Sequence, residues 1–169
     1  MNRLSTLGCL LLCLSLHACQ CSDKPEVGPV ADASASLEEQ AEQLGKPIYD
    51  TQCAQCHQAN GQGIPGSFPP LIQTEWVLGD KGRLVRLLLN GMQGPLEVDG
   101  EAYNGIMILP PPSLTDEQIA AVLSYVRQHF SNDADAVTPG EVAAVRAANE
   151  KEGFWEAAKL LEMTGVPGE

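Results

Sequence analysis

Cys53-Ala54-Gln55-Cys56-His57 is the stretch of this 169-residue chain that constrains its structure most. Two thiols three positions apart lie on one face of a helical turn, where both can reach the two vinyl groups of a single porphyrin. The imidazole of His57 follows directly, so it can become the proximal ligand of the porphyrin iron. The spacing Cys-x-x-Cys-His therefore predicts one covalently attached haem, held by Cys53 and Cys56 and ligated by His57.

Two other uses of paired cysteines are the alternatives. A redox-active Cys-x-x-Cys pair is typical of a strand-to-helix junction and has no adjacent ligand. A structural zinc site needs four ligands, commonly from a second pair of Cys or His residues, and no such pair follows His57 in this chain. The residues around the motif favour haem over both.

The first 18 residues have the pattern of a secretory signal peptide. Asn2-Arg3 gives a positively charged start, and residues 7–16 form a short apolar core. A transmembrane helix needs about 20 apolar residues, so this core is too short to span a bilayer. We therefore expect residues 1–18 to be removed on export.

The residues around the expected cleavage position, Leu16-His17-Ala18-Cys19, resemble the lipobox of bacterial lipoproteins, except that His17 stands where a small residue is usual. The resemblance implies that Cys19 is diacylated and becomes the mature N-terminus. Two acyl chains on one residue are enough for stable anchoring. Gln20 is not the Asp that often retains such proteins at the inner membrane, which favours an outer-membrane anchor facing the periplasm. The alternative is an ordinary secreted protein cleaved near Ala18.

Beyond the signal, the chain has the length and composition of one globular domain. Over the whole sequence 44% of residues are hydrophobic and 5% are aromatic. A buried porphyrin would count as part of the modest core. The 22 acidic and 10 basic residues give a formal net charge of −12. This charge argues against nucleic acid and anionic lipid as partners and suggests a protein with a basic docking patch; the alternative is that it serves solubility alone.

Helix-capping signals organise the chain that follows an expected disordered tether at residues 19–35. They mark four helix starts, at Ser36–Glu39, Asp80, Thr115–Gln118 and Thr138–Glu141. We expect Gly45 and Pro47 to separate the first helix from the one that carries the haem motif. Residues 91–114 have Gly and Pro at short intervals and are predicted to be irregular, and a last helix is predicted over Phe154–Met163. Because no strand pattern of useful length is found, the predicted fold class is all-α.

Residues 45–130 resemble the class I cytochromes c. Gly45 and Tyr49, eight and four residues ahead of the first haem cysteine, stand where that family has a small and an aromatic residue on its first helix. Val122 and Tyr125 stand at the corresponding apolar and aromatic places of its last helix. The resemblance implies that these two helices cross closely, which a glycine without a Cβ permits.

The same resemblance implies how the proximal side of the haem is built. Pro69-Pro70-Leu71 matches the Pro-x-Leu that follows the haem helix in this family. The match implies that the Pro69 carbonyl accepts a hydrogen bond from His57 and that Leu71 packs on the ring. A bond of this kind fixes the tautomer of the ligand and strengthens it.

The sixth iron ligand implied by the resemblance is Met107, which precedes the last haem-domain helix as the axial methionine of the family does. A thioether raises the reduction potential relative to a second histidine. Met92 is the main alternative, although a methionine more often fills a core. Family members commonly have proline directly after this methionine, whereas Ile108 and Leu109 intervene here before Pro110. The expected path of this loop therefore departs from the family pattern.

A bacterial subgroup of the family, often fused to or partnered with quinoprotein dehydrogenases and copper enzymes, is similar around Trp76 and Tyr103. It also tends to carry a C-terminal helix like Thr138–Val142, followed by a tryptophan like Trp155. By this resemblance Trp76 and Tyr103 could donate hydrogen bonds to the haem propionates. The alternative is that both simply fill the core, where polar-tipped aromatics need a partner.

These resemblances imply a class I cytochrome c fold around one covalent haem, extended by C-terminal helices. The expected segments are a signal peptide, a tether, a haem domain and a helical extension, at residues 1–18, 19–35, 36–132 and 133–169.

The site chemistry favours an electron carrier over two other classes. In a carrier both axial positions are filled, by His57 and Met107, so no substrate reaches the iron. A haem enzyme or gas sensor would need a displaceable distal ligand and a catalytic acid or base, and residues 100–112 offer little besides Glu101. A structural lipoprotein stabilised by haem has no specific support. We expect a non-catalytic, monomeric carrier that exchanges single electrons with a donor and an acceptor protein, as partner or subunit of a dehydrogenase or oxidase.

Overall fold

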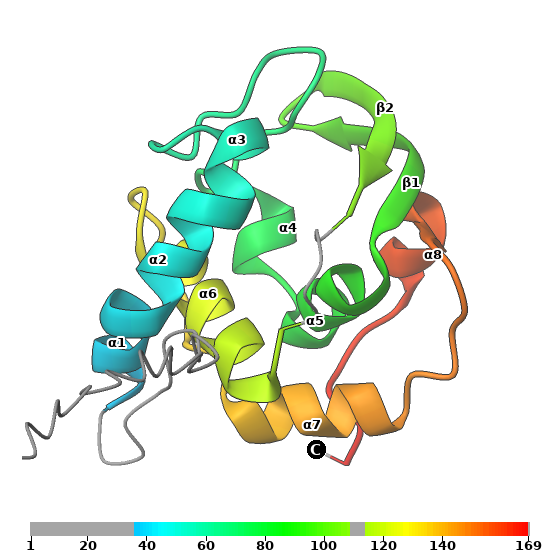
Figure 1. The fold of residues 1–169 in the computed structure, drawn as a ribbon. Coiled ribbons are helices and arrows are strands. Elements are labelled where there is room, and N and C mark those ends of the chain that lie inside the picture. Colours follow the sequence, from blue (N-terminus) through cyan, green and yellow to red (C-terminus); the bar gives the residue numbers. More distant parts are fainter. Residues whose placement is uncertain (1–35, 109–113, 169) are drawn as a thin grey trace, which may run out of the picture.

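The computed structural model describes residues 36–108 and 114–168. Helices surround a central cavity, and a long hairpin closes the side opposite the N-terminal helices (Figure 1). The expected signal peptide, tether and acylation site at Cys19 lie outside the described residues. Within the described ranges, no helix is both long and apolar enough to cross a bilayer.

The N-terminal part is one continuous helical run from Leu37 to His57, so the expected break at Gly45 and Pro47 is wrong. Ser36 begins it with a capping box, its hydroxyl accepting from the Glu39 amide at 3.2 Å. The chain keeps right-handed helical angles at Gly45, with φ −67° and ψ −46°. Two wider π-type turns alternate with α-helical segments: α1 (Leu37–Gln40), η1 (Ala41–Gly45), α2 (Lys46–Ile48), η2 (Tyr49–Cys53) and α3 (Ala54–His57). Pro47 lies in α2, directly after the first π-type turn.

This run crosses helix α6 (Asp116–Gln128) at Gly45. A Cβ built on Gly45 would lie 2.2 Å from the backbone oxygen of Ala121, closer than any side chain could come. Next to the crossing, the rings of Tyr49 and Tyr125 pack with centroids 5.5 Å apart. The close helix crossing implied by the family resemblance is therefore present, and it fixes the haem-motif turn relative to α6.

Two shorter helices form the floor of the cavity. Helix α4 (Glu75–Leu78) is capped by Thr74, and α5 (Lys81–Asn90) is capped by Asp80, whose carboxylate accepts from the Arg83 amide at 2.7 Å. Gly91 ends α5 with φ 74°, a left-handed conformation that glycine adopts without strain. The cap at Asp80 and the stop at Gly91 agree with the sequence-based prediction.

The segment after α5 is a β-hairpin, so the prediction of irregular structure is wrong over Met92–Met107. Strand β1 (Met92–Val98) pairs antiparallel with β2 (Glu101–Met107), from Val98 opposite Glu101 to Met92 opposite Met107. Asp99 and Gly100 form the turn with φ 53° and 80°, and positive φ at both central residues matches the twist of the strands. The fold class all-α is therefore only approximate: the protein is helical with a small sheet.

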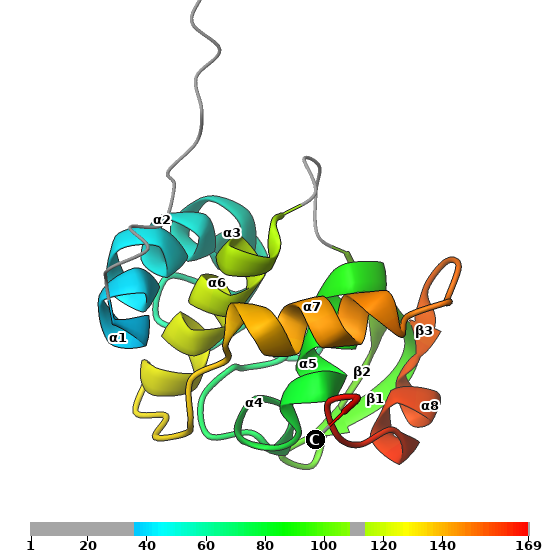
Figure 2. The ribbon, with the colours of Figure 1, turned by 90° about the horizontal axis from the view of Figure 1, so that it is seen from below.

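The C-terminal part packs against the same body. Helix α7 (Pro139–Ala147) lies across α5 and α6 (Figure 2), while β3 (Trp155–Glu156) adds a parallel strand to β1 and leads into α8 (Ala157–Glu162). The helix predicted over Phe154–Met163 thus begins only at Ala157, because the preceding residues pair with β1 instead. Val142 and Val145 are fully buried in the main core, and Leu160 is fully buried under the hairpin. The domain boundary at residue 133 stays a prediction.

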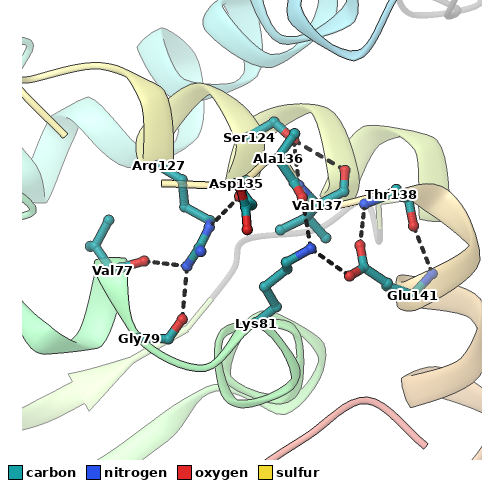
Figure 3. A network of polar contacts seen from close by, with 10 residues as sticks. All are labelled: Val77, Gly79, Lys81, Ser124, Arg127, Asp135, Ala136, Val137, Thr138 and Glu141. Atoms are coloured by element: carbon teal, nitrogen blue, oxygen red, sulfur yellow. Dashed lines mark hydrogen bonds and ion pairs between the residues drawn. The ribbon is translucent and has the colours of Figure 1, made fainter. Parts of the chain in front are cut away.

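A polar network ties the segment before α7 to α5, α6 and the end of α4 (Figure 3). The buried guanidinium of Arg127 donates to three backbone oxygens, those of Val77, Gly79 and Asp135. Lys81 donates to the Glu141 carboxylate and to the Ala136 oxygen, at 2.6 and 3.0 Å. A buried cation is tolerated when its donors are paired in this way. The network therefore holds the end of α4, which carries part of the cavity wall, against α6.

Candidate functional site

A deep, mostly apolar cavity lies between the helical run, α4, α5, α6 and the hairpin. Its empty volume is about 1360 Å³, counting the open solvent at its mouth. The side chains that line it include both cysteines and the histidine of the motif, and none of the described lining residues is Asp, Glu, Lys or Arg. The arrangement suits a large, flat, apolar group with one covalently held edge.

Cys53 and Cys56 lie on one wall of this cavity, half-buried and not joined in a disulfide. Burial raises the pKa of the Cys53 thiol to about 11, and the neighbouring Cys56 adds to this shift. A redox-active pair needs a thiol with a depressed pKa, so the site does not resemble one. In the part of the chain that the structure describes, no group of three or more His, Cys, Asp or Glu residues could hold a metal ion, which leaves the zinc alternative without further ligands.

His57, the candidate proximal ligand, lies on the same wall and has 8% of its surface exposed. Its Nδ1 lies 2.9 Å from the Pro69 carbonyl oxygen. Because a carbonyl oxygen only accepts, Nδ1 carries the proton and Nε2 keeps a free lone pair. Burial lowers the pKa of His57 although the bond to Pro69 acts in the opposite direction, so the imidazole is neutral, the form that ligates iron.

The loop that carries Pro69 is fixed by its own backbone and by Asn132. The Leu71 amide donates to the Gly61 oxygen at 2.8 Å, and the Gly63 amide donates to the His57 oxygen at 2.9 Å. The buried Asn132 donates its side-chain amide to the Leu71 oxygen at 2.8 Å. Sequence reasoning missed Asn132, because a lone Asn in a polar stretch after α6 carries no signal of a contact 61 residues away.

Met92 and Met107 both line the opposite side of the cavity. They are direct cross-strand partners in the hairpin, so their side chains lie on the same face of the sheet with Cβ atoms about 5 Å apart. Met92 is buried among Trp76, Leu87 and other core residues, whereas Met107 sits partly exposed at the end of β2. The geometry therefore brings both candidates to the site.

Trp76 and Tyr103 also line the cavity, and both are buried. The Nε1 of Trp76 has no hydrogen-bond partner among the described residues, and neither does the buried Nε of Arg83, whose guanidinium lies 5.4 Å from the Trp76 ring. The Oε1 of Gln52, a lining residue that sequence reasoning missed, is likewise buried without a partner. Buried donors are normally paired. The unpaired Nε1 donor of Trp76 at this apolar cavity fits a bound group that brings its own acceptor oxygens, as a haem does through its carboxylates; Gln52 Oε1 is an acceptor, and Arg83 does not line the cavity.

Other residues weighed from the sequence lie away from the cavity. His129 bonds the Tyr125 oxygen at 2.9 Å and the Glu42 carboxylate at 2.6 Å, which makes it a cap at the end of α6. Glu101 is exposed at the hairpin turn and does not line the cavity. Leu71, by contrast, lies in the cavity wall; that it packs on the ring stays a prediction.

A cysteine pair beside a neutral histidine, a proline carbonyl behind that histidine and an apolar cavity in front of it define a haem-binding helical domain. Residues 42–130 match the family model described as Cytochrome c. This match covers more than half of the chain, and the protein belongs to the cytochrome c family. It follows that the cofactor is one covalently bound haem c.

Individual relatives agree with this assignment. Cytochrome c-552 of Thermus thermophilus is 51% identical over 86 residues, covering 48% of this chain and 64% of that protein. The fructose dehydrogenase cytochrome subunit of Gluconobacter japonicus is 32% identical over 116 residues, 63% of this chain and 23% of the subunit. The Cbb3-type cytochrome c oxidase subunit CcoP of Rhodobacter capsulatus is 33% identical over 131 residues, 73% of this chain and 42% of the subunit. The chain thus spans less than two thirds of the length of these curated relatives.

Proposed function

We propose that this protein carries single electrons, with His57 and Met107 as the two axial ligands of a haem attached through Cys53 and Cys56. One observation supports the proposal above others: the cavity wall holds a neutral, pre-oriented histidine on one side and methionine on the other. When bound, the haem supplies a reversible ferric–ferrous couple. The protein's own residues then need only to fill both axial positions and to exclude water.

Each residue of the site has a defined part in this proposal. The Pro69 carbonyl holds His57 in one tautomer and one ring orientation, which increases the basicity of the ligand. The thioether of Met107 favours the ferrous state and so raises the reduction potential. Leu71 and the other apolar lining residues keep the surroundings dry, which reduces the rearrangement that accompanies each electron transfer. Trp76 offers an unpaired Nε1 to the haem carboxylates, and Tyr103 lies in the same wall.

A haem enzyme or gas sensor is the second candidate, but it needs a proton donor or acceptor beside an open iron. The described lining offers no carboxylate and no amine; besides the thiols and His57, Tyr103 is its ionisable side chain. Burial and the nearby acids raise the pKa of Tyr103, so its hydroxyl stays protonated at neutral pH. The carrier function needs none of these groups, and for this reason it is preferred.

The names of the relatives suggest the class of partner. Relatives that are subunits of a fructose dehydrogenase and of a Cbb3-type cytochrome c oxidase support a donor or acceptor of this kind for the present chain. We further propose that the protein works in the periplasm, as a monomer tethered by residues 19–35 to a lipid anchor at Cys19 in the outer membrane. The lipobox-like Leu16–Cys19 supports this location.

Rapid mixing of the reduced protein with carbon monoxide tests the function directly. With both axial positions filled, the spectrum should stay unchanged over the seconds in which an open ferrous haem would react completely. A potentiometric titration of the same sample should follow a single one-electron curve in both directions. Fast carbon monoxide binding by the wild type would favour the enzyme or sensor instead.

A further inference from the structure

The C-terminal segment, defined here as residues 149–166, meets the hairpin at the end that carries Met107. Its strand β3 and helix α8 lie beside β1 in both ribbon views (Figures 1 and 2). Gly91 marks the meeting point, because a Cβ built there would lie 2.5 Å from the Met107 backbone oxygen and 3.0 Å from the Phe154 ring. The Trp155 amide donates to the Gly91 oxygen at 3.1 Å. The segment therefore contacts the hairpin directly beside the proposed distal ligand.

Side chains extend this contact along β1. The Gln93 amide donates to the Glu156 carboxylate at 2.6 Å. Leu160 on α8 is fully buried in the hydrophobic cluster that also contains Met92. Of the helices and strands that the structure describes, β2 packs mainly on β1, and β1 packs on β3 and α8. The position of β2, and of Met107 at its end, therefore depends on how firmly the C-terminal segment holds β1.

Both ends of the C-terminal segment are fixed to α5, which forms part of the cavity floor. Asn90, the last residue of α5, donates its side-chain amide to the Lys151 oxygen at 2.8 Å. At the other end of α5, the Asp80 carboxylate accepts from the Gly165 amide at 2.6 Å. Arg86 donates to the Gly165 oxygen at 3.1 Å. The segment thus ties the hairpin to the floor of the same cavity.

We propose that the C-terminal segment positions the distal ligand, with Glu156 and Leu160 acting through β1 to keep Met107 at the haem iron. The proposal rests on the electron-carrier function, in which Met107 is the sixth ligand. Ferric iron holds a soft thioether more weakly than ferrous iron does, so the oxidised protein depends most on the segment. When its hold on β1 is weakened, the hairpin moves away in a fraction of the molecules and other ligands gain access to the iron.

Titration of the oxidised, full-length, haem-loaded protein with imidazole measures that fraction. Imidazole binds the iron only after Met107 has left it, so its apparent affinity is proportional to the fraction of molecules in which the hairpin is displaced. Leu160→Ala leaves a vacated volume beneath β1 and should raise the apparent affinity about tenfold or more. The loss of the red absorption band of methionine–iron ligation reports each binding step.

Ile119→Ala is the matched control for this variant. Ile119 is 2% exposed in the main core on α6, does not line the cavity, and loses the same number of side-chain carbons as Leu160. Both variants should lower the melting temperature, because each leaves a hole in a core. Only Leu160→Ala should change the imidazole affinity, which separates positioning of the ligand from a general loss of stability.

Glu156→Ala tests the same contact at the surface, where the core stays intact. Loss of the hydrogen bond from Gln93 should raise the imidazole affinity about threefold. Glu156→Gln keeps an acceptor oxygen and should restore the wild-type value. Glu162→Ala is the control, because it removes an exposed carboxylate of α8 that bonds Lys159 instead of the hairpin. This variant should behave as the wild type.

Two results would overturn the positioning proposal: equal increases in imidazole affinity in Leu160→Ala and Ile119→Ala, or wild-type affinity in every folded variant of the C-terminal segment. Either result leaves the carrier function in place as long as the wild type shows the methionine–iron band. A wild type that lacks this band refutes the ligation by Met107, and the positioning proposal with it.

Discussion

Replacing Gly45 with alanine tests the helix crossing on which the haem-motif turn depends. Alanine is the better helix former, and in an exposed helix interior this exchange stabilises by about 1 kcal/mol. At Gly45 the new methyl group would lie 2.2 Å from the Ala121 oxygen, whereas real Cβ atoms essentially never come within 3.0 Å of a neighbour. The obstacle is backbone of α6, which has no rotamer to change, so the two helices must move apart.

The steric effect should exceed the propensity effect. Overpacking a core costs about 1–3 kcal/mol, and the rigid obstacle places Gly45→Ala at the upper end of this range. Subtracting the gain in helix propensity leaves a net loss of about 2 kcal/mol in the free energy of unfolding. For a domain of this size each kcal/mol lowers the melting temperature by about 4 °C, so the expected decrease is about 8 °C.

Thermal unfolding of the haem-loaded protein, followed by circular dichroism, measures this effect. Gly140→Ala is the matched control, because Gly140 is exposed in the first turn of α7 and a Cβ there would meet only the Thr138 hydroxyl at 3.9 Å. The control should raise the melting temperature or leave it unchanged. A Gly45→Ala protein as stable as the wild type would show that the crossing is looser than the structure indicates.

Three further changes have distinct expected outcomes. Tyr49→Phe removes the hydroxyl that donates to the Gln58 oxygen at 2.6 Å and should cost about 1 kcal/mol in urea unfolding, with no change in the haem spectrum. Burial alone would raise the pKa of Glu141, but hydrogen bonds from Lys81 and from the start of its own helix lower the pKa below the ordinary glutamate value of 4.5. The ionised form of Glu141 therefore stabilises the fold above about pH 4.5, and this contribution disappears as the pH falls through the lowered pKa. Between pH 6 and pH 3 the free energy of unfolding should fall less for Glu141→Gln than for the wild type. An equal fall in both proteins would contradict the assignment. Cys19→Ser should abolish incorporation of labelled fatty acid, and wild-type protein found unlabelled in the soluble periplasmic fraction would refute the lipid anchor.

The helices were predictable where their signals are local. Ser36, Asp80, Thr115 and Thr138 each cap a helix within three residues of their own position, and a cap of this kind is visible in the sequence. The hairpin also had a local signal, Asp99-Gly100, but Gly and Pro within β1 obscured the strand pattern around it. Strand β3 could not be predicted, because two residues become a strand only by pairing with β1 some 60 positions away.

In the candidate site, too, some features have a local signal in the sequence and others depend on tertiary packing. The thiols and His57 belong to one short motif and were placed together from the sequence, whereas the contact between His57 and the Pro69 carbonyl was implied by the family resemblance. The contact between Asn132 and the Leu71 loop, and the unpaired Nε1 of Trp76, depend on tertiary packing and became visible only in the structure. The cross-strand pairing of Met92 with Met107 at the same cavity also became visible only in the structure, because no strand was predicted there.

The central claim is that Met107 closes the distal side of the haem opposite His57, and Met107→Ala compared with Met92→Ala tests it most directly. Both variants replace a methionine that lines the cavity with alanine, so the chemical change is the same in each. The two variants differ in whether the methionine that is lost is the proposed iron ligand. We predict that Met107→Ala loses the red absorption band of methionine–iron ligation, binds carbon monoxide when reduced and has a lower reduction potential. Met92→Ala should lose about 2–5 kcal/mol of stability from the vacated core and keep both the band and the potential. A Met107→Ala protein that keeps the band, together with a Met92→Ala protein that loses it, would contradict the assignment.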